Sequence, residues 1–275
     1  MINMSSLDRL SLESKVAIVT GSTQGLGEAI AHLFADRGAA GLVITGRNEA
    51  NGKRVKAALE AKGVRTIFVP ADLAKAEDAE KIVEATDKAF GRVDILVNAA
   101  GLTDRGTIWD TKPELFDLIF AVNLRAPFFL MQHSLNVMRR EKIEGSIINI
   151  ISMSGHGGQS FITAYSASKG ALITLTKNVA NSVMNHRIRV NGLTIGWMDT
   201  PGEDRIMKTY HDAEEGWLGE AEKQRPFGRL LKVDEVARAV AFLASSESGM
   251  MTGSIIDFDQ QVLGAADSPP TPPPV

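Results

Sequence analysis

The feature that most constrains the fold is a regular alternation of short apolar segments with longer amphipathic ones. The short segments are uniformly apolar and rich in β-branched residues, which is typical of buried strands. The segments between them place apolar residues at helical spacing. The expected strands are 15–21, 41–46, 66–73, 93–101, 146–152, 189–196 and 254–259. This order predicts an α/β fold with a doubly wound, mostly parallel seven-stranded sheet in three α/β/α layers.

The domain organisation expected from the sequence is a single domain over 1–275, although 275 residues would also allow two small ones. A loose leader is expected at 1–14, a polar segment at 199–226 and a proline-rich tail at 265–275. The expected helices are 28–38, 48–63, 75–91, 113–140, 163–184 and 233–245.

Composition excludes several classes of function. The net charge of −3 gives no reason to expect a nucleic acid or an anionic membrane as partner. The chain has no cysteine, so thiolate chemistry is excluded, and no histidine pair at ligand spacing suggests a metal. The N-terminus lacks an apolar signal region, and no apolar run is long enough to span a membrane. A cytoplasmic enzyme or binding protein is therefore expected.

A glycine-rich turn follows the first expected strand. The stretch TGSTQGLG places Gly21, Gly25 and Gly27 between that strand and a helix. Glycines allow a tight turn and a close approach of the backbone to a diphosphate at a helix N-terminus. Ser22 and Thr23 add hydroxyl donors. A glycine-rich turn without a ligand is the alternative, but its place in the first βαβ unit favours a dinucleotide.

The end of the second strand should meet the adenosine ribose. Gly46 stands near the position where an acid would bind the 2′-hydroxyl of NAD, and Arg47 follows it, which favours NADP over NAD. Arg47 could also be a solvated strand-end residue, and Glu49 makes the preference less clear. Asp72 could bind the adenine amino group or act as a helix N-cap.

Four polar residues form the candidate catalytic set. Tyr165 and Lys169 are four residues apart on an expected helix, so both side chains lie on one face. Ser152 closes a strand, and Asn123 lies in the long helix expected at 113–140. Each residue alone has an ordinary structural explanation, such as a turn serine or a chance helical pair.

Together with the glycine-rich turn and NAAG at 98–101, these residues resemble the short-chain dehydrogenase/reductase family in its classical, single-domain form, over roughly 14–260. The resemblance implies a Rossmann-type fold, and hydride transfer between a nicotinamide cofactor and a carbonyl or secondary alcohol. It implies that Tyr165 is the general acid/base and that the Lys169 cation lowers its pKa. Ser152 would orient the substrate oxygen, with Ser154 as second choice for this role. Asn123 would hold a water that relays protons to Lys169.

The resemblance also implies a cofactor site and a substrate lid at 199–226. The cofactor residues would be Gly21, Ser22, Thr23, Gln24, Gly25, Leu26, Gly27, Arg47, Asn48, Asp72, Leu73, Asn98, Ala99, Ala100, Gly101, Tyr165, Lys169, Gly196 and Thr200. The chain departs from the family at Ala99, where asparagine is more common, and at Ile195, where proline is usual. The family is usually dimeric or tetrameric, so a homotetramer or homodimer is expected.

The substrate remains open between several classes. The residues expected to line the pocket are Ser154, His156, Gln159, Trp197 and Met198, with Trp217 as a further candidate. They suit a sugar, a polyol or another small ketone, and equally an aromatic or oxoacyl substrate. A 3-oxoacyl-carrier-protein reductase would need a basic patch, for which the candidates are Arg105, Arg125, Arg139 and Arg140. A non-enzymatic dinucleotide-binding protein is a third possibility.

Overall fold

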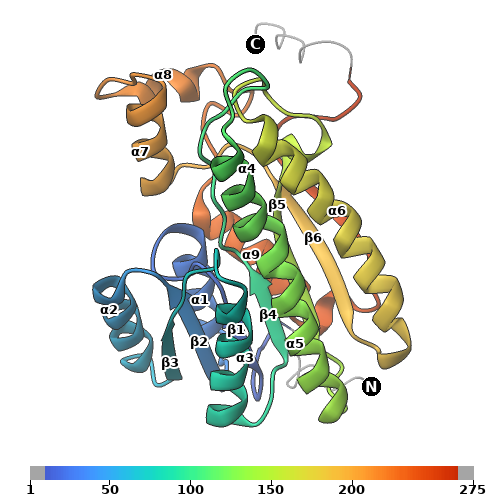
Figure 1. Ribbon diagram of the computed structural model, residues 1–275. Coiled ribbons are helices and arrows are strands. Elements are labelled where there is room, and N and C mark those ends of the chain that lie inside the picture. Colours follow the sequence, from blue (N-terminus) through green and yellow to red (C-terminus); the bar gives the residue numbers. More distant parts are fainter. Residues whose placement is uncertain (1–9, 266–275) are drawn as a thin grey trace, which may run out of the picture.

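The centre of the molecule is a parallel sheet of seven strands, seen in a computed structural model that describes residues 10–265 (Figure 1). Its spatial order is β3-β2-β1-β4-β5-β6-β7, and every neighbouring pair is parallel. The strands are β1 (Val16–Val19), β2 (Gly41–Gly46), β3 (Arg65–Pro70), β4 (Ile95–Asn98), β5 (Ser146–Ser152), β6 (Arg189–Ile195) and β7 (Ile255–Phe258). The strand order reverses between β1 and β4, and in such sheets the ligand crevice opens at that point beyond the carboxyl ends of the strands.

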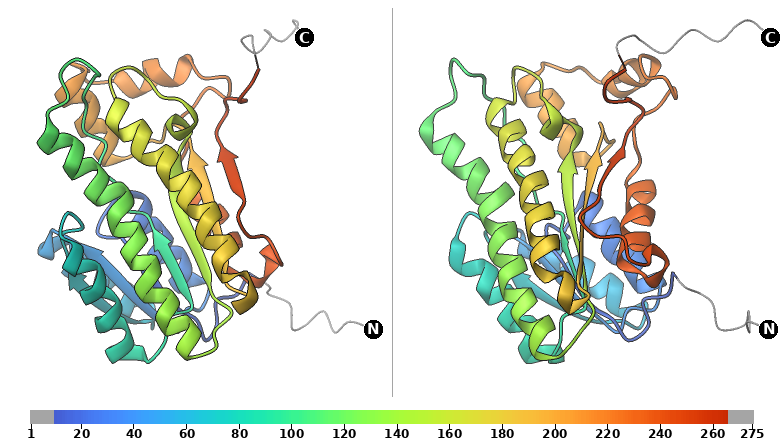
Figure 2. Two further views of the ribbon diagram at one scale, coloured as in Figure 1. Left: turned by 45° about the vertical axis from the view of Figure 1, so that its right-hand side comes forward. Right: turned by 90° about the vertical axis from the view of Figure 1, so that its right-hand side faces the viewer.

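Helices cover both faces of the sheet (Figure 2). They are α1 (Gly25–Asp36), α2 (Glu49–Glu60), α3 (Ala76–Phe90), α4 (Pro113–Phe120), α5 (Ala126–Arg140), α6 (Thr163–Val183), α7 (Pro201–Tyr210), α8 (Trp217–Lys223) and α9 (Val233–Ala244). One core cluster joins the sheet to α1, α2 and α9, and a second joins it to α3, α5 and α6. The three-layer α/β/α architecture expected from the sequence is therefore confirmed.

The burial of the central strands explains why they read as uniformly apolar. All four residues of β1 are buried, and β5 exposes only its last residue, Ser152, in part. Parallel strands covered on both faces need apolar side chains on both. Phe34 of α1 is completely buried, and burial of such a side chain contributes about 1.5–3 kcal/mol. Polar residues such as Ser152 therefore lie where the strands end. Helices α7 and α8 lie at the same edge of the sheet (Figure 1).

Two segments differ from the expectation at the N-terminus and after β4. Residues 10–14 are not a loose leader, because Leu12 is buried and its N–H donates to Arg37 O at 2.8 Å. The helix expected over 113–140 is interrupted by a π-helical turn, Ala121–Arg125, between α4 and α5. Pro127 contributes to this break, because it has no N–H for the carbonyl of Asn123 four residues earlier.

The segment at 199–226 contains two short helices, α7 and α8, where the sequence suggested only a long polar loop. Residues 1–9 of the expected leader and residues 266–275 of the expected tail lie outside the described part of the chain. No helix within residues 10–265 is both long enough and apolar enough to cross a bilayer.

Candidate active site

The glycine-rich turn is packed tightly on one side and open on the other. Helix α1 starts at Gly25, three residues before the expected start, so the turn continues directly into the helix. A Cβ at Gly21 would lie 2.8 Å from Ala100 Cα, and one at Gly27 would lie 2.5 Å from Gly21 O. Gly25 has a φ of +56° and nothing within 4 Å of a Cβ placed there. The open N-terminus of α1 therefore fits a diphosphate.

Hydroxyl groups near this turn hold strands together. The Ser22 hydroxyl donates to Val19 O at 2.6 Å and accepts from Thr45 N at 3.0 Å. It is therefore engaged within the protein, contrary to the expectation that it supplies a donor to a cofactor. Thr20, which the sequence analysis did not single out, accepts from the N–H groups of Ala99 and Ala100 at 3.0 and 3.1 Å. Those two amides are occupied in the same way.

The end of β2 has no room for an acidic residue. A Cβ at Gly46 would lie 2.6 Å from Thr23 Oγ1, so a longer side chain would displace Thr23. Asn48 Oδ1 accepts from Asn51 N at 2.9 Å as the N-cap of α2, so this oxygen is engaged within the protein. The exposed Arg47 side chain makes no hydrogen bond or ion pair with any residue in the described range. Its guanidinium is therefore free to meet an anion.

The end of β3 places its residues differently from the expectation. Asp72 is not a helix N-cap, because α3 begins later with Lys75 in that position and Asp72 accepts instead from Ala74 N at 3.1 Å. The side chain of Leu73 is buried in the core. Only the partly exposed carboxylate of Asp72 remains available at this point of the sheet edge.

Asn98, at the end of β4, belongs to a buried polar network. Its Nδ2 donates to Asn149 Oδ1 at 2.8 Å, and Asn149 Nδ2 donates to Thr176 Oγ1 at 2.9 Å. These bonds tie β4 to β5 and β5 to α6. Asn98 Oδ1 is buried and has no partner among the described residues. A buried acceptor without a partner is uncommon in folded proteins.

Ser152, Tyr165 and Lys169 lie together where β5 ends. Ser152 Oγ forms a hydrogen bond of 2.8 Å with Ser154 Oγ, and its side chain also bonds to the Tyr165 side chain. Lys169 is 4% exposed, and its Nζ donates to Ile150 O at 2.8 Å. The same Nζ lies 5.8 Å from the centre of the Tyr165 ring. The structure therefore brings the three residues together.

The titration of this pair differs from the expectation. Burial raises the pKa of Tyr165 to about 12, and the hydrogen bond from Ser152 only partly opposes this. Burial lowers the pKa of Lys169 to about 8. The predicted lowering of the Tyr165 pKa by Lys169 is therefore wrong for the protein alone, because desolvation of the phenolate is the larger effect.

Asn123 lies in the π-helical turn and is almost completely buried. Its Oδ1 accepts from Leu102 N at 2.8 Å, and its Nδ2 donates to Leu102 O at 2.9 Å and to Ser168 Oγ at 3.1 Å. Both side-chain donors are thus taken by the protein. A Cβ at Gly101 would lie 3.7 Å from both Asn123 Oδ1 and Lys169 Nζ, so the two polar groups approach the same point.

Among the residues expected to line the substrate pocket, some face other partners. His156 Nε2 lies 3.0 Å from Asp257 Oδ1 on β7, and Gln159 is exposed. Met198 pairs with Leu231 and packs against the core. His156 and Met198 therefore already contact other parts of the protein, where the sequence suggested contact with the substrate.

Residues after β6 join the sheet to the lid helices. Trp197 Nε1 donates to Glu203 Oε1 at 2.8 Å, and its ring stacks on Trp217 at a centroid distance of 5.8 Å. Thr200 is the N-cap of α7 and accepts from Glu203 N at 3.0 Å. A side chain at Gly196 would collide with Asp259. Trp197 therefore stays at the site, and the Thr200 oxygen accepts the capping bond while its O–H can still donate to a ligand.

Two charged residues near Tyr165 were missed by the sequence analysis as parts of one site. Arg105 lies in the loop after β4, and Glu203 lies in the first turn of α7. Arg105 Nη2 is 3.7 Å from Glu203 Oε1, and both side chains are mostly buried. The Glu203 charge acts to raise the pKa of Tyr165, and Arg105 acts to lower it. No local pattern could have revealed this pairing, because the residues are far apart in the chain.

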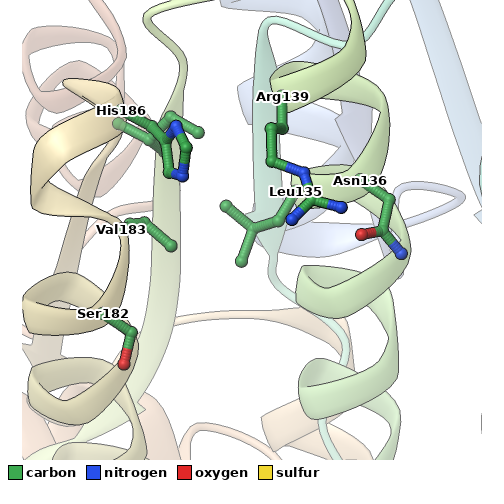
Figure 3. A pocket seen from close by; sticks show the side chains of 7 residues that line it. Leu135, Asn136, Arg139, Ser182, Val183 and His186 are labelled. Atoms are coloured by element: carbon green, nitrogen blue, oxygen red, sulfur yellow. The ribbon is translucent and has the colours of Figure 1, made fainter.

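A separate hollow in the structure lies away from this site. It is a shallow pocket of about 150 Å³ between α5 and α6, lined by Leu135, Asn136, Arg139, Ser182, Val183, His186 and Ile188 (Figure 3). Val183 ends α6 while Tyr165 lies near its start, so the two places are separated by roughly 27 Å along the helix. The pocket is therefore not part of the candidate active site.

Comparisons with known proteins agree with this geometry. A family profile described as enoyl-(acyl carrier protein) reductase matches residues 21–260. An uncharacterized oxidoreductase of Thermotoga maritima is 37% identical over 250 residues, which cover 91% of this chain and 98% of that protein. Galactitol 2-dehydrogenase of Agrobacterium fabrum is 31% identical, over 91% and 98% of the two chains.

A similar solved structure is L-sorbose reductase from Gluconobacter frateurii, complexed with NADPH and L-sorbose. It has a TM-score of 0.86 and 29% identity, and the match covers 94% of this chain and 99% of that one. The matches extend over nearly the whole chain, and the range of the family profile contains Gly21–Gly27 and Tyr165. This chain belongs to the short-chain dehydrogenase/reductase family of oxidoreductases, which act on CH–OH groups.

Proposed function

We propose that this protein reversibly transfers a hydride between NADP(H) and the carbonyl or secondary alcohol of a small sugar, polyol or related ketone. The observation that carries the proposal is the group formed by Ser152, Tyr165 and Lys169 where β5 ends. A phenol that hydrogen-bonds a serine, with an ammonium group beneath it, can deliver a proton to a substrate oxygen.

Each residue of this group has a defined task in the proposed reduction. The cofactor supplies the hydride that the carbonyl carbon receives. Ser152 donates a hydrogen bond that orients the carbonyl oxygen. Tyr165 gives its proton to that oxygen, and a pKa of about 12 keeps the phenol protonated near neutral pH. Lys169, with a pKa of about 8, retains enough positive charge near neutral pH to stabilise the phenolate that results.

Asn123 has a positioning task in this scheme. Its side chain fixes the backbone of Leu102 beside Gly101 and binds the hydroxyl of Ser168, one residue before Lys169. Because Pro127 provides no N–H for the Asn123 carbonyl, that oxygen can accept a bond from a water near Lys169. The carbonyl oxygen of Asn123 therefore holds the water that relays protons to Lys169, and the Asn123 side chain holds this part of the backbone in place.

Three features at the end of β2 support NADP over NAD. Gly46 leaves no room for the acidic side chain that would bind a free 2′-hydroxyl. Arg47 has no hydrogen-bond or ion-pair partner in the described chain. Both residues lie at the edge of the sheet that meets the adenosine ribose. An unpaired guanidinium suits the additional 2′-phosphate of NADP. The similar L-sorbose reductase, whose complex contains NADPH, agrees with this preference.

The substrate class is supported by two of the similar proteins. Galactitol 2-dehydrogenase and L-sorbose reductase are named for a polyol and a sugar. A 3-oxoacyl-carrier-protein reductase is the alternative, but two of the four arginines proposed for its basic patch lie beside acidic residues. Arg140 pairs with Asp87 and Glu141 at the far end of α5, and Arg105 lies beside Glu203.

The test is NADPH oxidation by the purified protein over a panel of sugars, small ketones and oxoacyl thioesters. Tyr165→Phe should lower the turnover by about 10²–10⁴-fold while NADPH still binds, because only the proton donor is lost. Tyr210→Phe is a matched control, since that tyrosine is half-exposed and bonds to Asp104 on the lid side. Near-normal turnover by Tyr165→Phe would refute the assignment, and NADPH binding without turnover of any carbonyl would favour a non-enzymatic role.

We also infer that the chain assembles as a homodimer or homotetramer. Phe116 and Leu118 of α4 and Phe128 of α5, two helices that follow one another along the chain, are each about 40% exposed. Such a group of apolar side chains suits an interface between subunits. Light scattering at several protein concentrations tests this inference, and a monomer at all of them would contradict it.

A further inference from the structure

The loop after β4 brings a guanidinium to the substrate side of Tyr165. Gly106 N donates to Phe161 O at 2.9 Å, and Thr163 N donates to Gly106 O at 3.1 Å. These bonds fix the loop that carries Arg105 against the start of α6. The Arg105 side chain is only 15% exposed, and its charge influences the pKa of Tyr165. Arg105 is therefore a fixed cation within electrostatic reach of the proposed proton donor.

Arg105 is held on several sides but keeps unused donors. Its Nε donates to His211 Nε2 at 3.1 Å, its Nη1 donates to Thr103 O at 2.9 Å, and its guanidinium lies 5.3 Å from the centre of the Phe161 ring. Nη2 lies 3.7 Å from Glu203 Oε1, which is too far for a hydrogen bond. A guanidinium has five N–H groups, so three of them remain for a ligand.

A second guanidinium on the lid side has no counterion. Arg225 lies 5.2 Å from the centre of the Trp197 ring, and its Nε is buried without a partner. Within residues 10–265, no carboxylate forms an ion pair with it. Trp197 Nε1 donates to Glu203 Oε1 at 2.8 Å, so Arg225 lies against the same indole ring that binds this carboxylate. Cations in this state lose hydration that a bound anion can replace.

We propose that the substrate is a polyhydroxy carboxylate, or the corresponding keto acid, whose carboxylate binds Arg105. The inference rests on the proposed function and narrows its substrate class. The planar fork of a guanidinium matches a carboxylate with two parallel hydrogen bonds. The substrate carboxylate takes the place of Glu203 opposite Nη2, and Glu203 then accepts a bond from a substrate hydroxyl.

The reaction keeps the carboxylate unchanged. The keto carbon of the substrate gains a hydride from NADPH, and its oxygen gains the proton of Tyr165, so a hydroxy acid and NADP⁺ are formed. Arg105 acts at the other end of the molecule, where its hydrogen bonds fix the distance between the keto group and Tyr165. Its role is therefore to bind the substrate and to determine specificity.

The experiment compares substrates that differ only at one end. Pairs of a ketose and a keto acid are chosen so that a terminal hydroxymethyl group in one is a carboxylate in the other, with L-sorbose and 5-keto-D-gluconate among them. We expect kcat/KM to be about 10–100-fold higher for the keto acid, since hydrogen bonds to a charged group are worth that factor. Arg105→Gln should lower kcat/KM for the keto acid about 10–100-fold more than for the ketose, because only the keto acid loses a charged hydrogen-bond partner.

A matched control removes a charge from the same region without touching the site. Arg205 is exposed on α7, and Arg205→Gln should leave both substrates unaffected. If every ketose reacts as well as its keto acid, or if Arg105→Gln affects both members of a pair equally, the proposal is overturned.

A binding measurement separates this inference from the proposed function. D-gluconate should raise the melting temperature of the NADP⁺-loaded protein, and Arg105→Gln should abolish this shift, while sorbitol has little effect on either protein. This result would support the carboxylate site even if no substrate in the panel turned over. A gluconate shift that is the same in the variant, or absent in the wild type, would contradict it whatever the turnover results.

Discussion

The proton-transfer residues and the lid residues are held in different ways. Lys169 and Asn123 are buried and bond mainly to backbone atoms, such as Ile150 O and both polar groups of Leu102. The lid is held by bonds between side chains, such as Trp197 to Glu203 and Trp217 to Asp204. Backbone partners cannot move unless the fold does, whereas side-chain partners can exchange. The first region is therefore preorganised, and the second can rearrange around different substrates.

The largest expected effect comes from a substitution of the buried residue Asn123. Asn123→Leu leaves the N–H and C=O of Leu102 without their partners in a buried environment. We expect the free energy of unfolding to fall by about 2–4 kcal/mol, since each buried unsatisfied group costs about 1–3 kcal/mol. Turnover should fall with it by about 100-fold or more, because Leu102 lies beside the catalytic group.

Urea unfolding and NADPH oxidation measure these two effects. Asn136→Leu is the control, since Asn136 is exposed on α5 and lines the distant pocket. Equal losses in both variants would show that Asn123 has no special role in holding Leu102.

The next largest effect is expected at the exposed Arg47, at the cofactor end of the candidate active site. Arg47→Gln removes the guanidinium proposed to meet the 2′-phosphate and should raise the KM for NADPH by about 10–100-fold, in line with one or two charge-assisted hydrogen bonds. The KM for NADH should stay the same, because NADH lacks that phosphate. Lys53→Gln, at an exposed position nearby on α2, is the control. If the KM for NADPH is unchanged in Arg47→Gln, another group determines the cofactor preference.

The contrast between residues held by the backbone and residues held by other side chains also explains which features the sequence could predict. The strands and the proximity of Ser152, Tyr165 and Lys169 follow from local patterns, because burial and the parallel sheet require them. The Ser22 hydroxyl was expected to donate to a cofactor, yet it donates to Val19 O and accepts from Thr45 N. A short hydroxyl side chain bonds to whichever group is nearest, and only the folded chain determines which group that is.

Two further differences have other physical causes. The pKa of Tyr165 depends on its burial, which no spacing of residues reveals. The pairing of Arg105 with Glu203 joins a loop and a helix about a hundred residues apart in the chain. Long-range contacts between polar loop residues leave no periodic signal in a single sequence.

Because Lys169 is buried, the free energy of unfolding should depend on pH. Its pKa of about 8 in the folded chain is below the ordinary value of 10.5, so the unfolded chain binds more protons between these two pH values. The free energy of unfolding of the wild type should therefore rise with pH in this window relative to Lys169→Met, by about 1.5 kcal/mol between pH 8 and pH 9.5.

The measurement is urea unfolding of both proteins, without cofactor, at several pH values. Lys177→Met is the control, since Lys177 is exposed on the same helix, and this variant should differ from the wild type by the same amount at every pH. A difference between wild type and Lys169→Met that stays constant from pH 8 to pH 9.5 would mean that Lys169 is solvated in the folded chain.

The smallest effect is expected in the lid. Trp217→Phe removes the indole N–H that donates to Asp204 at 2.8 Å, but it keeps an aromatic ring against Trp197. We expect kcat/KM to change by less than about fivefold and the free energy of unfolding by less than about 1 kcal/mol, because a partly exposed hydrogen bond contributes little net stability. Steady-state kinetics and urea unfolding test this against Trp109→Phe, whose tryptophan is almost fully exposed outside the lid. A loss in Trp217→Phe as large as that in Asn123→Leu would mean that the lid is as rigidly organised as the buried residues beneath it.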